Sequence, residues 1–156
     1  MSDFRQKPDF EDFENLPLRD FLSYRLTKVG AKVSAQGARK IREVSGLSLA
    51  QWRILALVGS MENNSASGLI QDDLMDKGLF SRNSRFLVDA GFLSQEIDPK
   101  DHRSKKLSLT SSGRELHDRI LPRMRERQKG LLSCLTPKER EALYSALEKI
   151  EKHVES

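Results

Sequence analysis

The sequence has few of the residues on which many enzymes and secreted proteins depend. Its 156 residues include a single cysteine, Cys134, so no disulfide can form within one chain. The three histidines are not spaced as metal ligands, and neither a glycine-rich phosphate loop nor a nucleophile elbow occurs. We therefore expect no enzymatic activity, no bound metal and no cofactor.

Long apolar stretches are missing as well. No run of residues approaches the roughly 20 apolar residues that a membrane-spanning helix needs. The first residues lack the basic-then-apolar order of a signal peptide. With 37% hydrophobic and 32% charged residues, the composition is that of an ordinary folded domain. We expect a cytoplasmic protein without a membrane partner.

What the sequence does contain is helical periodicity. Apolar residues recur at helical spacing from Leu16 to about Val44, and Gly46 is expected to end this helix. Further helices are predicted at about 49–58, 67–74 and 77–90, where Asp76 is a plausible N-cap. Two strands, 92–97 and 106–110, follow. Capping boxes at Ser48–Gln51, Ser112–Glu115 and Thr136–Glu139 predict the starts of three helices.

This order of elements predicts a mainly α protein with a small β-hairpin. Three helices followed by a hairpin are typical of a winged helix-turn-helix, here residues 46–110. Residues 1–15 form an arm with five acidic and three aromatic side chains, read either as a solvated segment or as a segment that docks on a partner. The helices in 16–45 and 111–156 leave apolar stripes without an obvious partner, which favours a homodimer.

The predicted helix 77–90 is basic on one side. Lys77, Ser81 and Arg85 share a face at helical spacing, and Arg82 and Asn83 lie beside it. Leu79, Phe86 and Leu87, with Phe80, are expected to form its buried side. Such a helix suits the major groove of double-stranded DNA, although an amphipathic surface helix would show the same pattern.

The hairpin loop adds more positive charge. Within residues 100–106 stand Lys100, Arg103, Lys105 and Lys106, against one acidic residue, Asp101. An arginine at the tip of a hairpin suits the minor groove, where negative potential is focused, and Asp101 is placed to orient Arg103. The net charge of +4 is compatible with a polyanionic partner. A solvated charged turn is the alternative interpretation.

These residues resemble a known family. Asp101-x-Arg103 followed by Leu107-x-Leu109-Thr110-x-x-Gly113 resembles the wing signature of MarR-type transcriptional regulators. The segments 46–58, 76–82, 90–93 and 135–143 resemble that family in its usual order. The resemblance implies a winged-helix homodimer that binds palindromic operators, usually as a repressor. It also implies release by a small anionic, often aromatic, effector bound between the two lobes.

Five residues are candidates for such an effector site. Phe21, Tyr24, Arg25 and Trp52 are placed to line a pocket between the lobes, with Arg25 pairing a ligand carboxylate. Core packing is the alternative for Phe21 and Trp52. His117 is placed to face the lobe interface, and a plain surface or packed histidine is its alternative.

Two further interpretations remain. We expect Cys134 to be a buried, inert thiol. A helical scaffold dimer without specific DNA binding, whose wing is only a charged turn, is the alternative function. The two functions differ in salt dependence, because DNA binding weakens steeply with added salt.

Overall fold

The described residues form helices and a β-hairpin, as the sequence predicts. A computed structural model describes residues 12–60, 75–97 and 105–155. Its elements are η1 (Leu18–Asp20), α1 (Leu22–Ser45), α2 (Leu49–Ser60), α4 (Lys77–Asp89), β1 (Leu93–Ile97), β2 (Lys105–Leu109), α5 (Ser111–Leu132) and α6 (Pro137–Val154). β1 and β2 pair antiparallel, with Leu93 opposite Leu109 and Ile97 opposite Lys105. The predicted mainly α class is confirmed.

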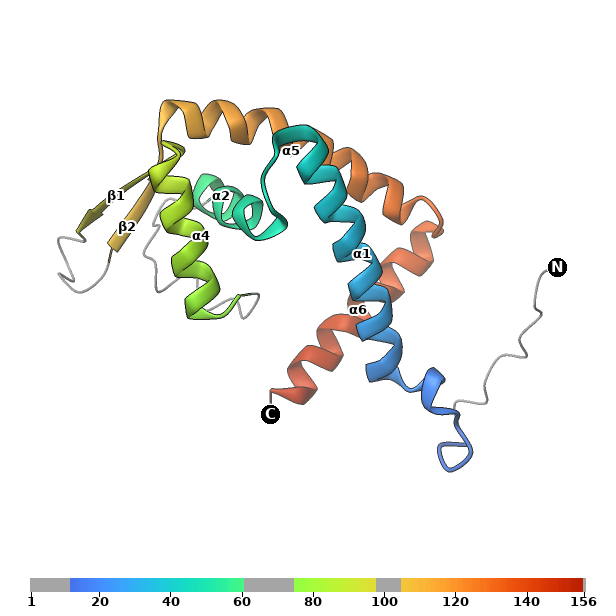
Figure 1. The fold of residues 1–156 in the computed structure, drawn as a ribbon. Helices are drawn as coiled ribbons and strands as arrows, with labels where there is room; N and C mark the ends of the chain where they lie inside the picture. Colours follow the sequence, from blue (N-terminus) through green and yellow to red (C-terminus); the bar gives the residue numbers. More distant parts are fainter. Residues whose placement is uncertain (1–11, 61–74, 98–104, 156) are drawn as a thin grey trace.

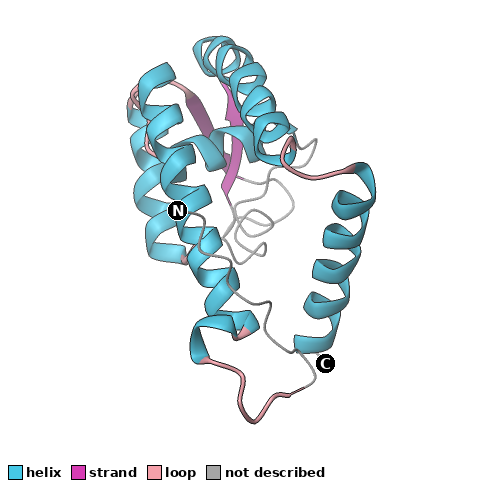
Figure 2. Cartoon of the chain, turned by 90° about the vertical axis from the view of Figure 1, so that its right-hand side faces the viewer, coloured by secondary structure: helices cyan, strands magenta, loops and turns pink. Residues whose placement is uncertain are grey.

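The elements form two parts, which Figure 1 shows side by side. α2, α4, β1 and β2 form one part, called here the winged lobe. α5 leads away from it, changing direction along its length as expected for a helix that contains Pro122. η1, the first half of α1 (residues 22–33) and α6 are called here the outer helices. α6 stands apart from the other helices in Figure 2.

The hydrophobic core lies in the winged lobe and in the helix ends that adjoin it. Among the described residues, seven large side chains are fully buried: Ile41, Ile54, Leu55, Leu87, Leu93, Leu107 and Ile120. They come from α1, α2, α4, β1, β2 and α5, so the core fixes the second half of α1 and the first half of α5 onto the lobe. α6 contains no buried residue.

Local signals in the sequence set several helix ends correctly. Gly46 takes the left-handed conformation (φ 76°) that ends α1. Ser48 and Gln51 form the predicted capping box: the Ser48 amide donates to Gln51 Oε1 at 2.8 Å, and the Gln51 amide donates to Ser48 Oγ at 3.2 Å. The Asp76 side chain accepts from the Leu79 amide at 2.8 Å and caps α4.

Two predicted helix starts are wrong. α1 begins at Leu22 rather than near Leu16, because Phe21 has an extended backbone (ψ 137°) that separates it from the short turn η1. α5 is capped by Thr110 rather than by Ser112. The Thr110 hydroxyl accepts from the Gly113 amide at 3.0 Å and donates to the Gly91 carbonyl at 2.6 Å. A contact with the preceding loop therefore decides where this helix starts.

Three side chains lie differently from the prediction. Phe86, which was expected on the buried side of α4, is 47% exposed. Ser84 is buried there instead, beside Phe80 and Leu87. Phe21 is 40% exposed rather than part of the core. Cys134 is exposed rather than buried, because it follows the end of α5 where little packs over the chain. The helix predicted at 67–74 lies outside the described residues.

No helix in the described ranges is both long and apolar enough to cross a membrane.

Candidate nucleic-acid interface

α4 is anchored so that its basic residues face outward. Phe80, Ser84 and Leu87 recur every three to four residues and are buried against the rest of the winged lobe. Lys77, Ser81 and Arg85, at the same spacing on a neighbouring face, are therefore exposed. The apolar positions thus fix the direction in which the predicted contact residues point.

A hollow of about 160 Å³ lies between α4 and the hairpin. Seven of the described residues line it: Lys77, Phe80, Ser81, Ser84, Arg85, Gln95 and Lys105. Of these seven, three are cations, three are neutral hydrogen-bonding groups, and none is a carboxylate. The fold thus brings the predicted face of α4 together with Gln95 and Lys105 of the hairpin strands in one positively charged surface, which suits a phosphate backbone.

Gln95 was not singled out from the sequence. It lies on β1 directly opposite Leu107, which is buried, and it lines the hollow together with Lys105. A single glutamine in a strand carries no signal of binding by itself. Only the antiparallel register, which brings β1 residues against β2 and α4, identifies it.

The two lysines of β2 differ in their surroundings. Successive side chains of a strand point to opposite faces, so Lys105 faces α4 while Lys106 faces the other way. Lys106 lies opposite Glu96 in the register and is half-buried, whereas Lys105 lies opposite Ile97 and is exposed. Lys105 is thus better placed than Lys106 to contact a ligand in the hollow.

Arg82 and Asn83 lie beside the hollow and do not line it. Arg82 is exposed, and its Nη1 lies 3.5 Å from the position that a Cβ on Gly78 would occupy. Asn83 Nδ2 donates to the Leu79 carbonyl at 2.8 Å. That bond ties the Asn83 amide to its own helix and leaves its oxygen as the group available to a ligand. Lys100, Asp101 and Arg103 lie outside the described residues.

The hairpin base is tied tightly to the ends of α4 and α5. The Phe92 carbonyl accepts from the Thr110 amide at 3.2 Å, and the Thr110 hydroxyl donates to the Gly91 carbonyl. A Cβ on Gly113 would overlap the Phe92 carbonyl oxygen. These contacts give a physical reason for the Leu-Thr-x-x-Gly pattern: the threonine caps α5 and holds the loop, and the glycine permits the close approach.

A second feature is a cavity of about 490 Å³ between α2 and α5. Trp52 and His117 line it, and their rings stack with centroids 5.8 Å apart. His117 is buried, and its Nδ1 lies 2.8 Å from Asp118 Oδ1. Arg53 and Arg125, which the sequence did not single out, also line the cavity. Helical spacing alone does not show that these arginines flank an aromatic pair.

The other three predicted effector residues lie elsewhere. Phe21, Tyr24 and Arg25 are exposed at the start of α1 and do not line this cavity. Lys28 Nζ lies 5.8 Å from the centre of the Tyr24 ring, so that ring already has a cationic neighbour. Within one chain, the structure brings together Trp52 and His117 only.

No protein-family model and no curated protein matches this chain. Many solved structures do match. A MarR-family transcriptional regulator from Silicibacter pomeroyi is 28% identical, with a TM-score of 0.71 over 86% of this chain and 90% of that one.

Two other matches carry information on ligands. The transcriptional repressor CouR, bound to a 23-mer DNA duplex, is 24% identical, with a TM-score of 0.75 over 86% of this chain and 94% of that one. BpsR of Bordetella bronchiseptica, whose DNA binding is regulated by 6-hydroxynicotinic acid, is 21% identical, with a TM-score of 0.77 over 86% and 96%.

The chain has the MarR-type winged-helix fold. In this fold the hollow lies on the winged lobe, and the cavity lies where α2 of that lobe meets α5. Several of the matched structures are described as transcriptional regulators of the MarR family. Within the described ranges, no group of three or more His, Cys, Asp or Glu side chains is arranged to hold a metal ion.

Proposed function

We propose that this chain is a homodimeric, sequence-specific DNA-binding regulator, of the repressor type, that a small aromatic anion releases from a palindromic operator. The observation that carries the DNA-binding part is the hollow between α4 and the hairpin. Its three cations, Lys77, Arg85 and Lys105, come from two elements, and none of the described residues that line it is a carboxylate. A strongly positive concave surface of this kind fits a phosphate backbone beside a groove.

α4 is proposed as the helix that enters the major groove. Ser81 and Arg85 on its outward face reach base edges or phosphates, and Arg82 and Asn83 lie at the side of the same helix. Lys105 and Gln95 are proposed to hold a DNA phosphate at the junction of helix and hairpin. Lys106, which faces the other way, is proposed to contribute less to phosphate binding. Arg103, oriented by Asp101, is proposed to enter the flanking minor groove, with Lys100 on a phosphate. CouR, of the same fold, has been seen on a DNA duplex.

The proposed homodimer is supported by apolar surface that the described part of the chain leaves exposed. Leu18, Leu22, Leu26 and Val29 recur at helical spacing along η1 and α1, and all are exposed. Leu143 and Tyr144 of α6 are exposed as well. A second copy would cover both stripes with the same surfaces, as a two-fold axis requires. Two α4 helices related by that axis would read half-sites roughly 10 bp apart.

The effector site is assigned to the cavity between α2 and α5. The stacked Trp52 and His117 rings offer aromatic surface, and Arg53 and Arg125 offer positive charge for a carboxylate. BpsR, of the same fold, responds to an aromatic acid. Phe21, Tyr24 and Arg25 remain candidates only if a second copy carries them to the cavity. Binding there would favour a spacing of the two α4 helices that does not fit the operator.

The test is DNA binding measured against salt. Duplexes selected from genomic DNA are titrated with wild type, Arg85→Ala and a control, Lys149→Ala, which removes a charge from α6. We expect the logarithm of affinity to fall linearly with the logarithm of salt, and less steeply in Arg85→Ala by about 0.9 for a lost phosphate contact. Lys149→Ala should match wild type. If no duplex is bound at low salt, the chain is instead a helical scaffold dimer.

A further inference from the structure

A third cavity lies between α1 and α5, away from both sites described above. It measures about 560 Å³. At about 100° per residue, its α5 residues (123, 126, 127, 130 and 131) face away from His117, Leu121 and Arg125 of the Trp52 cavity. Its charged lining residues are Arg39, Lys40, Glu43, Arg123, Glu126 and Arg127.

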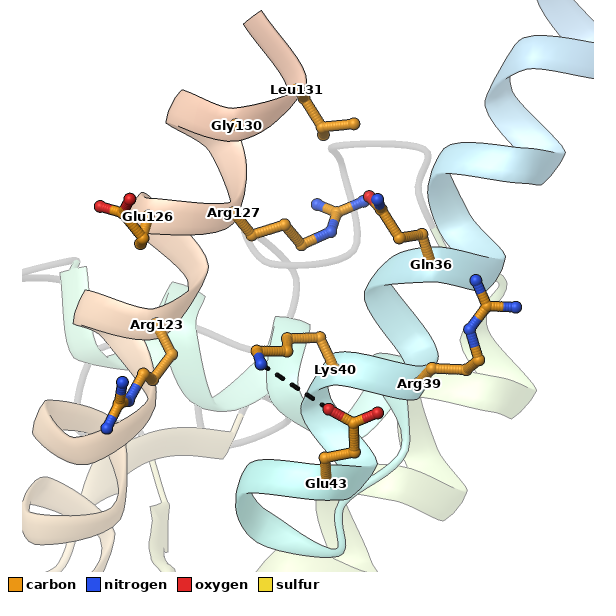
Figure 3. A pocket seen from close by; sticks show the side chains of 9 residues that line it. All are labelled: Gln36, Arg39, Lys40, Glu43, Arg123, Glu126, Arg127, Gly130 and Leu131. Carbon is orange, nitrogen blue, oxygen red and sulfur yellow. Dashed lines mark ion pairs between the residues drawn. The ribbon is translucent and has the colours of Figure 1, made fainter. Parts of the chain in front are cut away.

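Only some of these charges point into the space between the helices. In Figure 3, Arg127 reaches across from α5 and Lys40 reaches across from α1, so that the two cations approach the same gap. Arg39 and Arg123 point away from it. Lys40 Nζ has one anionic neighbour, Glu43 Oε2, at 3.7 Å with both side chains exposed in part. Glu126 also points away from the gap. Among the described residues, the gap therefore holds two cations and one loosely held carboxylate, that of Glu43.

Arg127 is held in a fixed position. Its Nη2 donates to the Val33 carbonyl at 2.5 Å. Its guanidinium carbon lies 3.4 Å from where a Cβ on Gly37 would be, so the small residue leaves room for the planar group. Its Nε is buried and has no hydrogen-bond acceptor within the described part of the chain. A buried N–H without an acceptor is unfavourable, and a guanidinium is a preorganised donor to a planar oxyanion.

We propose that this cavity binds a small oxyanion, a carboxylate or phosphate group, between the Arg127 guanidinium and the Lys40 ammonium. Leu131 and Gly130 offer the less polar wall for the body of such a molecule. Since the two cations come from different helices, the bound anion joins α1 to α5. This site is separate from the proposed aromatic effector site, and it does not depend on DNA binding.

The experiment uses inorganic phosphate as the probe and the full-length protein. Phosphate binding is followed by calorimetry at constant ionic strength, with chloride as the balancing anion. We expect a saturable site whose affinity falls about tenfold or more in Lys40→Ala, because a hydrogen bond between charged groups is lost. Arg39→Ala is the matched control: it removes an equal charge from the same helix, but from a side chain that points away, and should bind phosphate as wild type does.

Two further measurements separate this site from the others. Arg85→Ala, which alters the α4 hollow, should leave the saturable phosphate site intact. The protein's molecular mass in solution should be the same for Lys40→Ala and wild type. The proposal is overturned if wild type shows no saturable phosphate binding, or if Arg39→Ala and Lys40→Ala lose affinity equally. It is also overturned if Lys40→Ala weakens self-association without changing phosphate affinity, because a carboxylate of a second copy would then occupy the cavity.

Discussion

The winged lobe and the outer helices differ in how much of their apolar surface one chain covers. Ile54, Leu55, Leu87, Leu93 and Leu107 of the winged lobe are fully buried by their own chain. By contrast, α6 has no buried residue. Leu22 and Val29 in the first half of α1 are 53% and 54% exposed. The same sequence thus contains a lobe that completes its own core and helices that do not.

This difference predicts that the stability of the winged lobe is independent of protein concentration and that the stability of the outer helices is not. Contacts in the winged lobe stabilise each chain whatever its concentration, since they form within one molecule. In the proposed homodimer, association covers the outer helices, so their stability is expected to depend on protein concentration. Substitutions in the two regions should therefore be distinguishable by whether their effect changes when the protein is diluted.

The largest effect is expected for Gly113→Ala at the hairpin base. The new Cβ would overlap the Phe92 carbonyl oxygen, which is backbone and has no alternative rotamer. We expect the free energy of unfolding to fall by about 4 kcal/mol or more. Gly130→Ala in the same helix is the control: nothing lies within 4 Å of its Cβ position. The free energy of unfolding of Gly130→Ala should equal that of wild type or exceed it by up to about 1 kcal/mol. Denaturant unfolding of both variants measures the contrast, and equal effects would contradict it.

A smaller and more direct test compares Ile54→Ala with Leu26→Ala. Ile54 is fully buried, so its truncation should cost about 3 kcal/mol at every protein concentration. Leu26 is 41% exposed on α1, so its truncation should mainly weaken self-association. Thermal unfolding at a series of dilutions, with sedimentation to follow the mass, separates the two. If the Leu26→Ala defect is independent of concentration, the outer helices are stabilised within one chain after all.

Gly59→Ala tests the contact between the winged lobe and α5. A Cβ at this position would lie 2.8 Å from His117 Nε2 and Cδ2, so the imidazole must shift. Since a side chain can give way more easily than a carbonyl, we expect a loss of about 1–2 kcal/mol. The Trp52 fluorescence should change as well, because its ring stacks on His117. An unchanged emission spectrum would mean that the stacked pair does not depend on Gly59.

Features set by neighbours in the sequence could be predicted. The capping boxes of α2 and α6 need only residues three apart, and Gly46 ends α1 through its own backbone freedom. The outward face of α4 followed from helical spacing, because Lys77, Ser81 and Arg85 share a face in any helix. Those predictions rest on geometry that the rest of the fold does not alter.

Features set by tertiary contacts could not be predicted. Ser112 has a plausible capping sequence, but Thr110 caps α5 because its hydroxyl also reaches the Gly91 carbonyl, 19 residues earlier in the chain. Phe86 was expected on the buried side of α4, yet the neighbouring elements pack against Ser84 and Leu87 instead. Gln95 joins the hollow only through the register of the hairpin. Each of these outcomes depends on residues distant in sequence.

The smallest expected effect concerns the capping box at the start of α6. The backbone amide of Thr136 and then its hydroxyl donate to the Glu139 carboxylate and lower the pKa of that carboxyl below its ordinary value of 4.5. A lowered pKa in the folded state means that the ionised form is favoured by folding. The stabilisation that the ionised Glu139 carboxylate gives to the fold is therefore fully present above pH 4.5. It is lost as the pH falls through the pKa of this carboxyl in the folded state.

Two variants of Glu139 separate charge from hydrogen bonding. Glu139→Gln keeps an acceptor for the Thr136 amide and removes the titrating group. The protection of amides in the first turn of α6 from hydrogen exchange should then lose the pH dependence that ionisation of Glu139 gives it. Glu139→Ala removes the acceptor as well and should speed exchange of the Thr136 amide at neutral pH. Because α6 has no buried residue, its first turn depends on this local cap more than any turn of α2 does. Equal exchange in wild type and Glu139→Ala would mean that association, rather than the cap, holds the start of α6.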